Sequence, residues 1–252
     1  VSRASRPGVS VSMLRLAMWS GPRNMSTAMM RAWENRPDTA VVDEPLYGPY
    51  LARTHIAHPD ATAVIDAQGK DYAAAMQTCA QQTHGQAAIF YQKHMTHHLL
   101  PDLDHSWLQG LTNAFLIRDP AQVLASYLRT RGEATAQDLG VQRQTDIYAY
   151  VSSFQDNVVI IDAADFLKQP EAHLRAWCAA LQVDFVPQML AWPSGPRDSD
   201  GVWAPHWYAS AWASTGFEPY RKRNITTPSQ YRALVDECHS LYESMYARRL
   251  LT

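Results

Sequence analysis

Residues 14–27 read LRLAMWSGPRNMST, and this stretch decides the class of fold. Leu14 to Trp19 is a short apolar run that is typical of a buried strand. Ser20, Gly21 and Pro22 interrupt the run, and from Asn24 to Asn35 apolar residues recur at helical spacing. The stretch therefore predicts a strand, a tight turn and a helix in direct succession.

The same alternation of strand and helix continues along the chain. Further strands are expected at Thr39–Val42, Ala87–Gln92, Asn113–Ile117 and Asn157–Asp162. Further helices are expected at Asp71–Gln82, Ala121–Arg131, Gln137–Phe154, Pro170–Leu181, Trp207–Ser214 and Pro228–Leu250. Residues 46–70 show no clear period and are expected to be loop with a short helix, and residues 185–205 to be loop. Such alternation predicts an α/β fold of three layers, with a central, mostly parallel sheet flanked by helices.

Length and composition indicate a single globular domain. The chain has 252 residues, of which 46% are hydrophobic, enough to bury a core. Residues 1–12 are polar and predict a flexible N-terminal arm. We expect residues 13–252 to form one domain, in which residues 185–252 are a C-terminal cap.

Several classes of function are disfavoured by the bulk properties. A net charge of −2 gives no reason to expect a nucleic-acid partner. No apolar run approaches the roughly 18 residues that a membrane span needs. The three cysteines lie far apart, at Cys79, Cys178 and Cys238, which argues against disulfides and zinc and favours a reducing compartment, hence the cytoplasm. The sequence does not determine the oligomeric state, and a homodimer is compatible with it.

The turn after the first strand has the properties of an anion site. A helix start offers unpaired N–H groups and the positive end of the helix dipole. Arg23 can bind two anion oxygens with its guanidinium, and Ser26 and Thr27 can donate hydroxyl hydrogen bonds. The pattern GxxxxGK[ST] of nucleotide triphosphatases is absent. The alternative is an ordinary helix start with a solvated Arg23.

A second motif, RDPAQVLAS, follows the strand at Asn113–Ile117 and opens the next helix. Together with the first turn, it resembles the sulfotransferases, which carry a loop such as SPRSGST after the first strand and R-[DN]-P-x-x-x-x-x-S after a later one. The fold implied is P-loop-like. More narrowly, WSGPRNMST and DEPLY resemble a bacterial and plant branch of sulfotransferase-like proteins. Some of that branch are named after branched-chain aminotransferases, although nothing in this chain looks like an aminotransferase.

The resemblance implies binding of the sulfuryl donor 3'-phosphoadenosine-5'-phosphosulfate (PAPS), with PAP as the product. Arg118 and Ser126 would bind the 3'-phosphate. The first loop would bind the 5'-phosphosulfate, through Gly21, Pro22, Arg23, Asn24, Met25, Ser26 and Thr27. This loop departs from SPRSGST, because Asn24 replaces a serine and Met25 a glycine.

Sulfuryl transfer to an alcohol needs a base near the acceptor proton. Glu44, after the second strand, resembles the glutamate that some bacterial and tyrosyl-protein sulfotransferases use as the base. Lys93 and His94 lie where the small-molecule enzymes carry Lys-x-His. On an extended chain adjacent side chains point to opposite faces, so we expect only one of the two to reach the donor. Glu44, His94, His97 and His98 all remain candidates.

Three histidines lie close together in the sequence after the third expected strand. His94, His97 and His98 have the spacing of one helix face, which would permit metal binding. No carboxylate or cysteine pattern supports it, and sulfuryl transfer does not require a metal. We therefore expect no metal.

Aromatic residues cluster late in the chain. Trp203, Trp207 and Trp212 are candidates for the wall of an acceptor pocket or for a cage around a quaternary ammonium group, and Tyr47 and His97 for the same pocket. The alternative is ordinary packing of a C-terminal cap. By analogy with the family, a basic residue among Arg221, Lys222 and Arg223 would contact the 3'-phosphate.

The sequence thus predicts a PAPS-dependent sulfotransferase acting on a hydroxyl or amine of a small-molecule acceptor. The acceptor itself is not identified. Two alternatives stay open: an ATP-dependent small-molecule kinase on a P-loop fold, and a catalytically silent nucleotide-binding or partner-binding protein.

Overall fold

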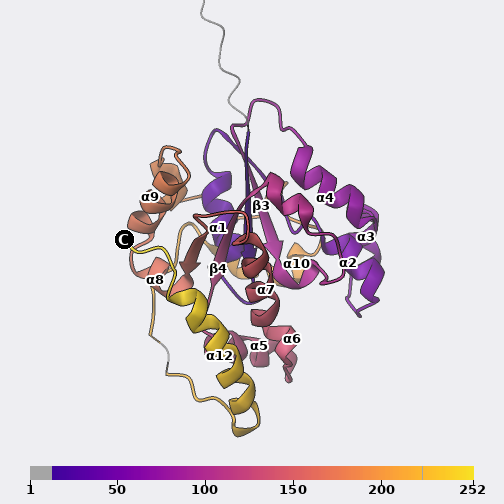
Figure 1. The fold of residues 1–252 in the computed structure, drawn as a ribbon, viewed down its shortest axis with the longest axis vertical. Helices are drawn as coiled ribbons and strands as arrows, with labels where there is room; N and C mark the ends of the chain where they lie inside the picture. The colour runs from indigo at the N-terminus through magenta and orange to yellow at the C-terminus, as the bar shows by residue number, and fades with distance from the viewer. Residues whose placement is uncertain (1–12, 223) are drawn as a thin grey trace, which may run out of the picture.

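The centre of the molecule is a five-stranded parallel sheet (Figure 1). The computed structural model describes residues 13–222 and 224–252, so the expected arm at 1–12 and Arg223 lie outside the described residues. The strands are β1 (Leu14–Ser20), β2 (Thr39–Asp43), β3 (Ile89–Met95), β4 (Thr112–Ile117) and β5 (Val159–Asp162). Their order in the sheet is β2-β3-β1-β4-β5. The expected α/β class with a parallel central sheet is confirmed.

The strands are apolar along their length because helices cover both faces of the sheet. In β1, Ala17 and Trp19 face one side, whereas Leu16 and Met18 face the other, and all four are fully buried. A strand buried on both faces cannot show the alternation of a half-exposed one. The continuous apolar run at the start of the chain is therefore explained by its central place in the sheet.

The helices divide between the two faces. Met29 and Trp33 of α1 (Ser26–Glu34) pack with Trp177 of α9 (Pro170–Ala180) on one face. The other face is covered by α7 (Val141–Val151) and α12 (Arg232–Tyr246), which contact each other (Figure 1). The remaining helices are α2 (Tyr47–Thr54), α3 (Ala61–Gln68), α4 (Tyr72–Gln81), α5 (Pro120–Arg131), α6 (Ala136–Leu139), α8 (Ala163–Lys168), α10 (Ala204–Trp207) and α11 (Ala209–Ala213). Short 3₁₀ turns are η1 (Thr96–His98), η2 (Ser106–Gly110), η3 (Pro187–Leu190) and η4 (Ser229–Tyr231).

The strand order places a binding crevice at the end of β1. After β1 the chain forms β2 at one edge of the sheet and then β3, which lies between β2 and β1. It then crosses to β4, which lies on the other side of β1. Connections that leave in opposite directions open a crevice beyond the carboxyl end of the strand between them. The loops after β1, β2, β3 and β4 therefore meet at one edge of the sheet.

Several stretches differ from the expected elements. The helix expected at Trp207–Ser214 is interrupted at Tyr208, between α10 and α11, and α8 was not expected. Residues 46–70 were expected to be loop with a short helix, but they hold both α2 and α3. α2 contains Gly48 and Pro49, two residues that disfavour a helix, so the sequence of this stretch does not suggest one. The helix expected at 137–154 is two helices, because Gly140 has φ +69° and ends α6.

The break at Gly140 has a packing reason. A Cβ on Gly140 would lie 3.1 Å from Cδ of Pro22, and one on Gly21 would lie 3.2 Å from the carbonyl oxygen of Leu139. The turn after β1 therefore packs directly against the junction of α6 and α7. Glycine is required where two backbones approach this closely.

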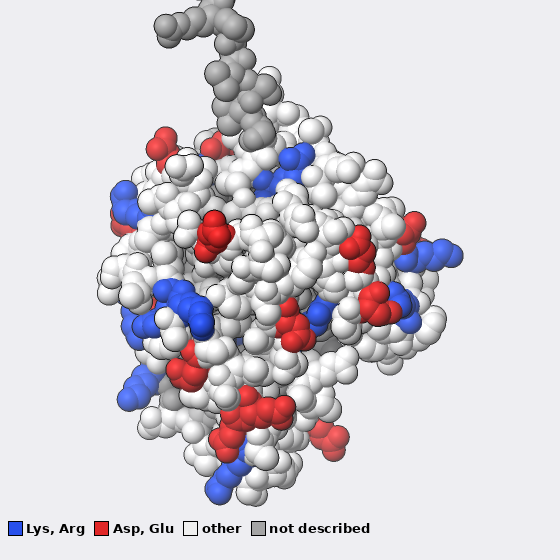
Figure 2. Space-filling view, viewed as in Figure 1, with Lys and Arg blue, Asp and Glu red and all other residues white. Residues whose placement is uncertain are grey.

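The surface carries mixed charge. Figure 2 shows acidic and basic side chains interspersed over one face of the molecule. Within the described ranges, no helix combines the length and apolar character of a membrane span.

Candidate active site

A cavity of about 670 Å³ opens at the carboxyl edge of the sheet. It is lined by the turn after β1, by residues that follow β2, β3 and β4, and by the segment that contains α10 and α11. Its volume lies in the range of small-molecule sites, about 300–1,000 Å³. The lining includes two sets of residues. The basic group comprises two arginines and the serine beside them: Arg23, Arg118 and Ser126. The aromatic group comprises Tyr47, His58, His98, Trp203 and Trp207.

The basic group joins the two sequence motifs. Arg23 Nε donates a hydrogen bond to Ser126 Oγ at 3.1 Å, across 103 residues of sequence. Arg118 Nη1 donates to the carbonyl oxygen of Arg23 at 2.6 Å. The residues expected to bind the two ends of an anionic donor are thus in direct contact.

Local sequence explains the position of the second motif. Arg118 follows β4 directly, and the Asp119 side chain caps α5 by accepting from the Gln122 N–H at 2.9 Å. Pro120 begins the helix, where its missing N–H costs nothing. Ser126 lies two turns further on and returns to the cavity beside Arg118. The cap therefore orients the helix that carries the serine.

Arg23 has an unusual backbone. Its φ is +54°, in the left-handed region that residues with a side chain seldom adopt. Burial and the nearby charge of Arg129 lower the pKa of Arg23. A guanidinium that is partly desolvated beside a second cation is favourably placed to bind an anion.

The first turn of α1 adds hydrogen-bond donors to this group. Asn24 Nδ2 donates to the carbonyl oxygen of Leu116 at 3.0 Å, and its Oδ1 accepts from the Met25 N–H at 2.8 Å. These bonds hold the turn to β4, so that α1 begins at Ser26 facing the cavity. The N–H groups of a helix start have no acceptor within the helix. Pro22, Asn24, Met25, Ser26 and Thr27 all line the cavity, whereas Gly21 does not.

Glu44 lies in the cavity wall after β2. Its φ is +43°, a second left-handed residue at a strand end. Its N–H donates to the carbonyl oxygen of Lys93 at 2.9 Å, and its carboxylate contacts the Lys93 ammonium. Burial raises the pKa of Glu44, while Lys93 opposes this effect. Glu44 is therefore a carboxylate that can accept a proton more readily than an exposed one.

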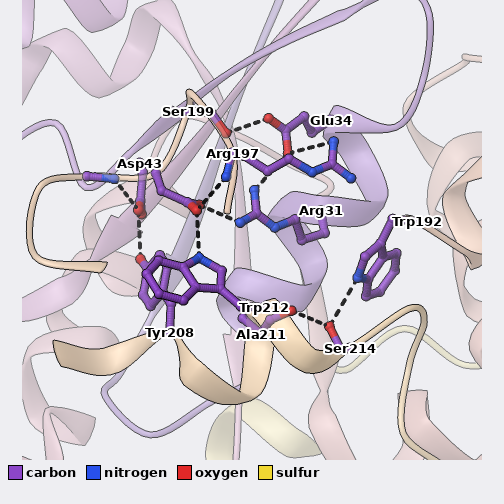
Figure 3. A network of polar contacts seen from close by, with 12 residues as sticks. Arg31, Glu34, Asp43, Trp192, Arg197, Ser199, Tyr208, Ala211, Trp212 and Ser214 are labelled. Carbon is purple, nitrogen blue, oxygen red and sulfur yellow. Dashed lines mark hydrogen bonds and ion pairs between the residues drawn. The ribbon is translucent and has the colours of Figure 1, made fainter. Parts of the chain in front are cut away.

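Lys93 is the centre of a buried polar cluster. Its ammonium donates to Asp43 Oδ1 at 2.8 Å and to the Tyr208 hydroxyl at 2.8 Å, besides contacting Glu44. The two carboxylates raise the pKa of Lys93 well above its usual value, so the lysine is charged. Tyr208 in turn donates to Asp43 Oδ2 at 2.7 Å (Figure 3). Neither Asp43 nor Tyr208 was among the expected site residues.

His94 points away from the cavity. Its ring stacks on Trp19 at 4.3 Å, and its Nε2 lies 3.1 Å from Gln92 Oε1. Burial, with Lys93 nearby, lowers the pKa of His94 to about 3. Of the two neighbours Lys93 and His94, only Lys93 lines the cavity, as the alternation of an extended strand requires. The expected catalytic role of His94 has no geometric basis.

The histidines after β3 lie at the cavity. His97 lines it, and burial lowers its pKa to about 4. His98 also lines it and stacks on Tyr47 at 4.4 Å. His98 Nδ1 lies 3.8 Å from Glu44 Oε2. The HH pair was visible in the sequence, but only the turn η1 decides which ring faces Glu44.

Two of the three expected tryptophans line the cavity. Trp203 and Trp207 do so, together with Tyr47, whose ring meets Trp203 edge to face at 5.1 Å. Trp212 does not line it, because its Nε1 donates to Asp200 Oδ2 at 2.9 Å outside the cavity (Figure 3). The expected place of Trp212 in the acceptor pocket therefore has no support from its position.

The C-terminal basic run lies elsewhere. Arg221 and Lys222 are exposed and do not line the cavity. Arg223 lies outside the described residues. The expected contact with a 3'-phosphate has no support from the positions of Arg221 and Lys222.

An ion network holds the cap segment to α1 (Figure 3). Arg31 is almost fully buried and pairs with Glu34 at 3.0 Å and with Asp200 at 2.5 Å. Glu34 also accepts from Ser199, and Trp192 Nε1 donates to Ser214 Oγ at 3.1 Å. The network anchors the segment that presents Trp203, Trp207 and Tyr208 to the cavity. In residues 13–222 and 224–252, no three His, Cys, Asp or Glu side chains gather in a way that could hold a metal ion.

Comparison with protein families and curated sequences gives two findings. A family model described as "Sulfotransferase domain" matches residues 14–249. Two Arabidopsis thaliana proteins, Branched-chain-amino-acid aminotransferase-like protein 2 and protein 1, are 31% and 32% identical over 224 residues. Each alignment covers 89% of this chain and 40% of the relative. The chain thus spans well under half the length of these relatives.

Solved structures share the fold. The sulfotransferase domain from the curacin biosynthetic pathway has a TM-score of 0.56 at 16% identity, covering 95% of this chain and 99% of that one. The sulfotransferase domain from the Synechococcus PCC 7002 olefin synthase has a TM-score of 0.57 at 17% identity, covering 99% and 100%. At these identities the similarity shows a shared fold.

Proposed function

The chain belongs to the sulfotransferase domain family, and from this premise we propose that it transfers a sulfuryl group from PAPS to a hydroxyl or amine of a small molecule. Family membership supports sulfuryl transfer as the general chemistry. The observation that carries the choice of donor is the contact between Arg23 and Ser126, with Arg118 bonded to the Arg23 carbonyl. It gathers two guanidiniums, a hydroxyl and a helix start in one cavity, which suits a ligand with two anionic groups.

The residues present fit such a donor. Arg118 and Ser126 would hold the 3'-phosphate. Arg23, Ser26 and Thr27, with the first N–H groups of α1, would hold the 5'-phosphosulfate. When bound, PAPS supplies an activated sulfuryl group whose leaving group is the phosphate of PAP.

The chain's own residues accept the proton, orient the group that accepts it, and stabilise charge on the leaving phosphate. Glu44 accepts the acceptor proton, because burial raises the pKa of its carboxyl. Lys93 keeps the Glu44 carboxylate oriented and is itself fixed by Asp43 and Tyr208. Arg23 and the helix start stabilise negative charge that develops on the leaving phosphate.

Calorimetric titration with PAP tests the donor site. We expect PAP to bind without metal, and Arg118→Ala and Arg23→Ala each to weaken binding about 10- to 100-fold, the effect of losing a hydrogen bond to a charged group. Arg175→Ala is the matched control, since Arg175 pairs with Glu171 on an exposed part of α9. Unchanged PAP affinity in both site variants would contradict the proposal.

The same titration separates the alternatives. A kinase would bind ATP with magnesium more tightly than PAP. A silent binding protein would take PAP but turn over no acceptor. Sulfuryl transfer from PAPS to an acceptor, measured as release of PAP that depends on the acceptor, excludes both.

A further inference from the structure

One polar atom in the cavity wall has no hydrogen-bond partner among the residues that the structure describes. His98 is 2% exposed, and its Nδ1 is buried without a hydrogen bond to any described residue. Such an atom is costly unless another group satisfies it. His98 is one of the residues that line the cavity, so this nitrogen lies within the cavity wall.

The His98 ring is fixed in place. It stacks on Tyr47 with an interplanar angle of 10°, and the Tyr72 hydroxyl donates to the His98 carbonyl oxygen at 2.9 Å. Burial lowers the pKa of His98 well below its usual value, so the ring is neutral and carries one N–H. The ring can therefore act as a rigid donor or acceptor, but not as a cation.

The distance from this nitrogen to Glu44 suits a single oxygen atom. His98 Nδ1 and Glu44 Oε2 are 3.8 Å apart, too far for a hydrogen bond between them. An oxygen about 2.8 Å from each would bond to both. A hydroxyl meets the requirement, because it can donate its proton to Glu44 and accept from the His98 N–H.

Apart from Glu44 and its partner Lys93, aromatic side chains surround this position. Tyr47 packs against His58 at 5.4 Å and against Trp203 at 5.1 Å, and His58 packs near Trp207 at 6.2 Å. The adjacent cation, Lys93, is already bonded to Asp43, Glu44 and Tyr208. A carboxylate on the acceptor would be desolvated here without a counter-charge, which is unfavourable.

We propose that this position is the acceptor site and that it takes an uncharged aromatic alcohol. The hydroxyl oxygen lies between Glu44 Oε2 and His98 Nδ1, and the ring packs against the aromatic group. The inference rests on the proposed function. In the transfer, a lone pair of the acceptor hydroxyl oxygen forms the new O–S bond. The bond between sulfur and the phosphate oxygen of the donor breaks, and its electron pair stays on the phosphate of PAP. The acceptor proton passes to Glu44.

A matched set of acceptors tests the chemical class. Benzyl alcohol, cyclohexylmethanol and para-(hydroxymethyl)benzoate have similar hydroxyl acidity but differ in ring and charge. With PAPS as donor, we expect kcat/KM for benzyl alcohol to exceed that for each of the others by about 10-fold or more, in line with the loss of aromatic packing or the burial of a charge. Faster transfer to the benzoate or to cyclohexylmethanol would overturn the proposed class.

Two variants test the role of His98. His98→Phe keeps a ring against Tyr47 but removes the nitrogen, and His98→Asn keeps a nitrogen near the Nδ1 position. We expect kcat/KM for benzyl alcohol to fall about 10- to 100-fold in His98→Phe and to recover partly in His98→Asn, with PAP affinity unchanged in both. Full kcat/KM for benzyl alcohol in His98→Phe would show that the nitrogen is not needed, and it would assign His98 a packing role only.

A binding measurement makes the test independent of turnover. In the protein saturated with PAP, benzyl alcohol should shift the ring nitrogen resonance of His98, whereas cyclohexanecarboxylate should not. If PAP binds and no alcohol of the set shifts that resonance or is sulfated, the acceptor site is wrong and the donor assignment stands. If PAP itself does not bind, the proposed function fails, and this inference with it.

Discussion

Replacing Tyr208 by phenylalanine removes one hydroxyl from the centre of the buried polar cluster. The hydroxyl accepts from Lys93 at 2.8 Å and donates to Asp43 Oδ2 at 2.7 Å, and the tyrosine is only 5% exposed. The Trp203 indole N–H lies 3.4 Å from it. The ring fills the same space in the variant, so the change isolates the hydroxyl.

The effect on stability follows from these contacts. A hydrogen bond to a charged group contributes about 1.5–3 kcal/mol, and Tyr208→Phe loses two of them. Lys93 keeps both carboxylates, and Asp43 Oδ2 keeps the Gly201 N–H at 3.3 Å. Because the charges remain partly compensated, we expect the free energy of unfolding to fall by about 2–4 kcal/mol.

The effect on activity concerns the pKa of Glu44. Burial raises this pKa, and Lys93 and the Tyr208 hydroxyl both lower it, while Asp43 raises it. His98 also faces the carboxylate, from η1. Loss of the hydroxyl raises the Glu44 pKa further, so the ionised base is reached only at higher pH. The acid limb of kcat/KM against pH should therefore move to higher pH.

The assays are urea unfolding and a pH profile of PAP release from PAPS. Tyr220→Phe is the control, because Tyr220 lies outside the cluster. The Lys168 ammonium lies 5.2 Å from the centre of the Tyr220 ring. We expect PAP affinity to stay unchanged in both variants. An acid limb that stays in place in Tyr208→Phe, or that moves to lower pH, would refute the coupling between the cap segment and the base.

Three further predictions concern stability, each measured by urea unfolding. Burial lowers the pKa of His94 to about 3 and that of His97 to about 4 in the folded protein. As the pH falls, these histidines are therefore protonated in the unfolded chain before they are protonated in the folded one. Stability should drop by about 1.4 kcal/mol per pH unit for each histidine below about pH 6.5, and His94→Gln should flatten the slope. Arg31→Met should cost about 3–5 kcal/mol, since it leaves Asp200 buried without its cation, and a loss below 1 kcal/mol would contradict this. Gly140→Ala should lower the free energy of unfolding by about 1–2 kcal/mol, because alanine disfavours φ +69°. Equal stability would show that the backbone between α6 and α7 can change its conformation.

Much of the fold could be predicted because the signals are local. Apolar runs predicted all five strands to within a few residues, and helical spacing predicted α1, α4, α5, α9 and α12. The break at Gly140 was missed because its cause, the close approach of Pro22, lies far away in the sequence.

The candidate site was predictable in part. Arg23, Glu44 and Arg118 follow strand ends, and Lys93 lies near the end of β3. The carboxyl ends of parallel strands meet at one edge of the sheet. The assembly of these side chains around one cavity is therefore a consequence of sheet topology. The opposite orientations of Lys93 and His94 follow from strand geometry alone.

Other parts of the site depend on contacts between distant segments. Tyr208 reaches Lys93 and Asp43 only because Arg31 and Asp200 hold the cap segment to α1. The tryptophans of that segment look alike in the sequence, yet Trp203 lines the cavity and Trp212 bonds Asp200 outside it.

The sequence by itself determined the strand–helix alternation, the two motifs after β1 and β4, and the acidic residue after β2, because each depends on residues near one another in the chain. The tertiary structure decided which side chains meet: the contact of Arg23 with Ser126, the bond of Tyr208 to Lys93, and the histidine nitrogen facing Glu44. The physical reason is that hydrogen bonds and burial in this site join residues from five separate segments, and only packing of the whole chain sets their distances.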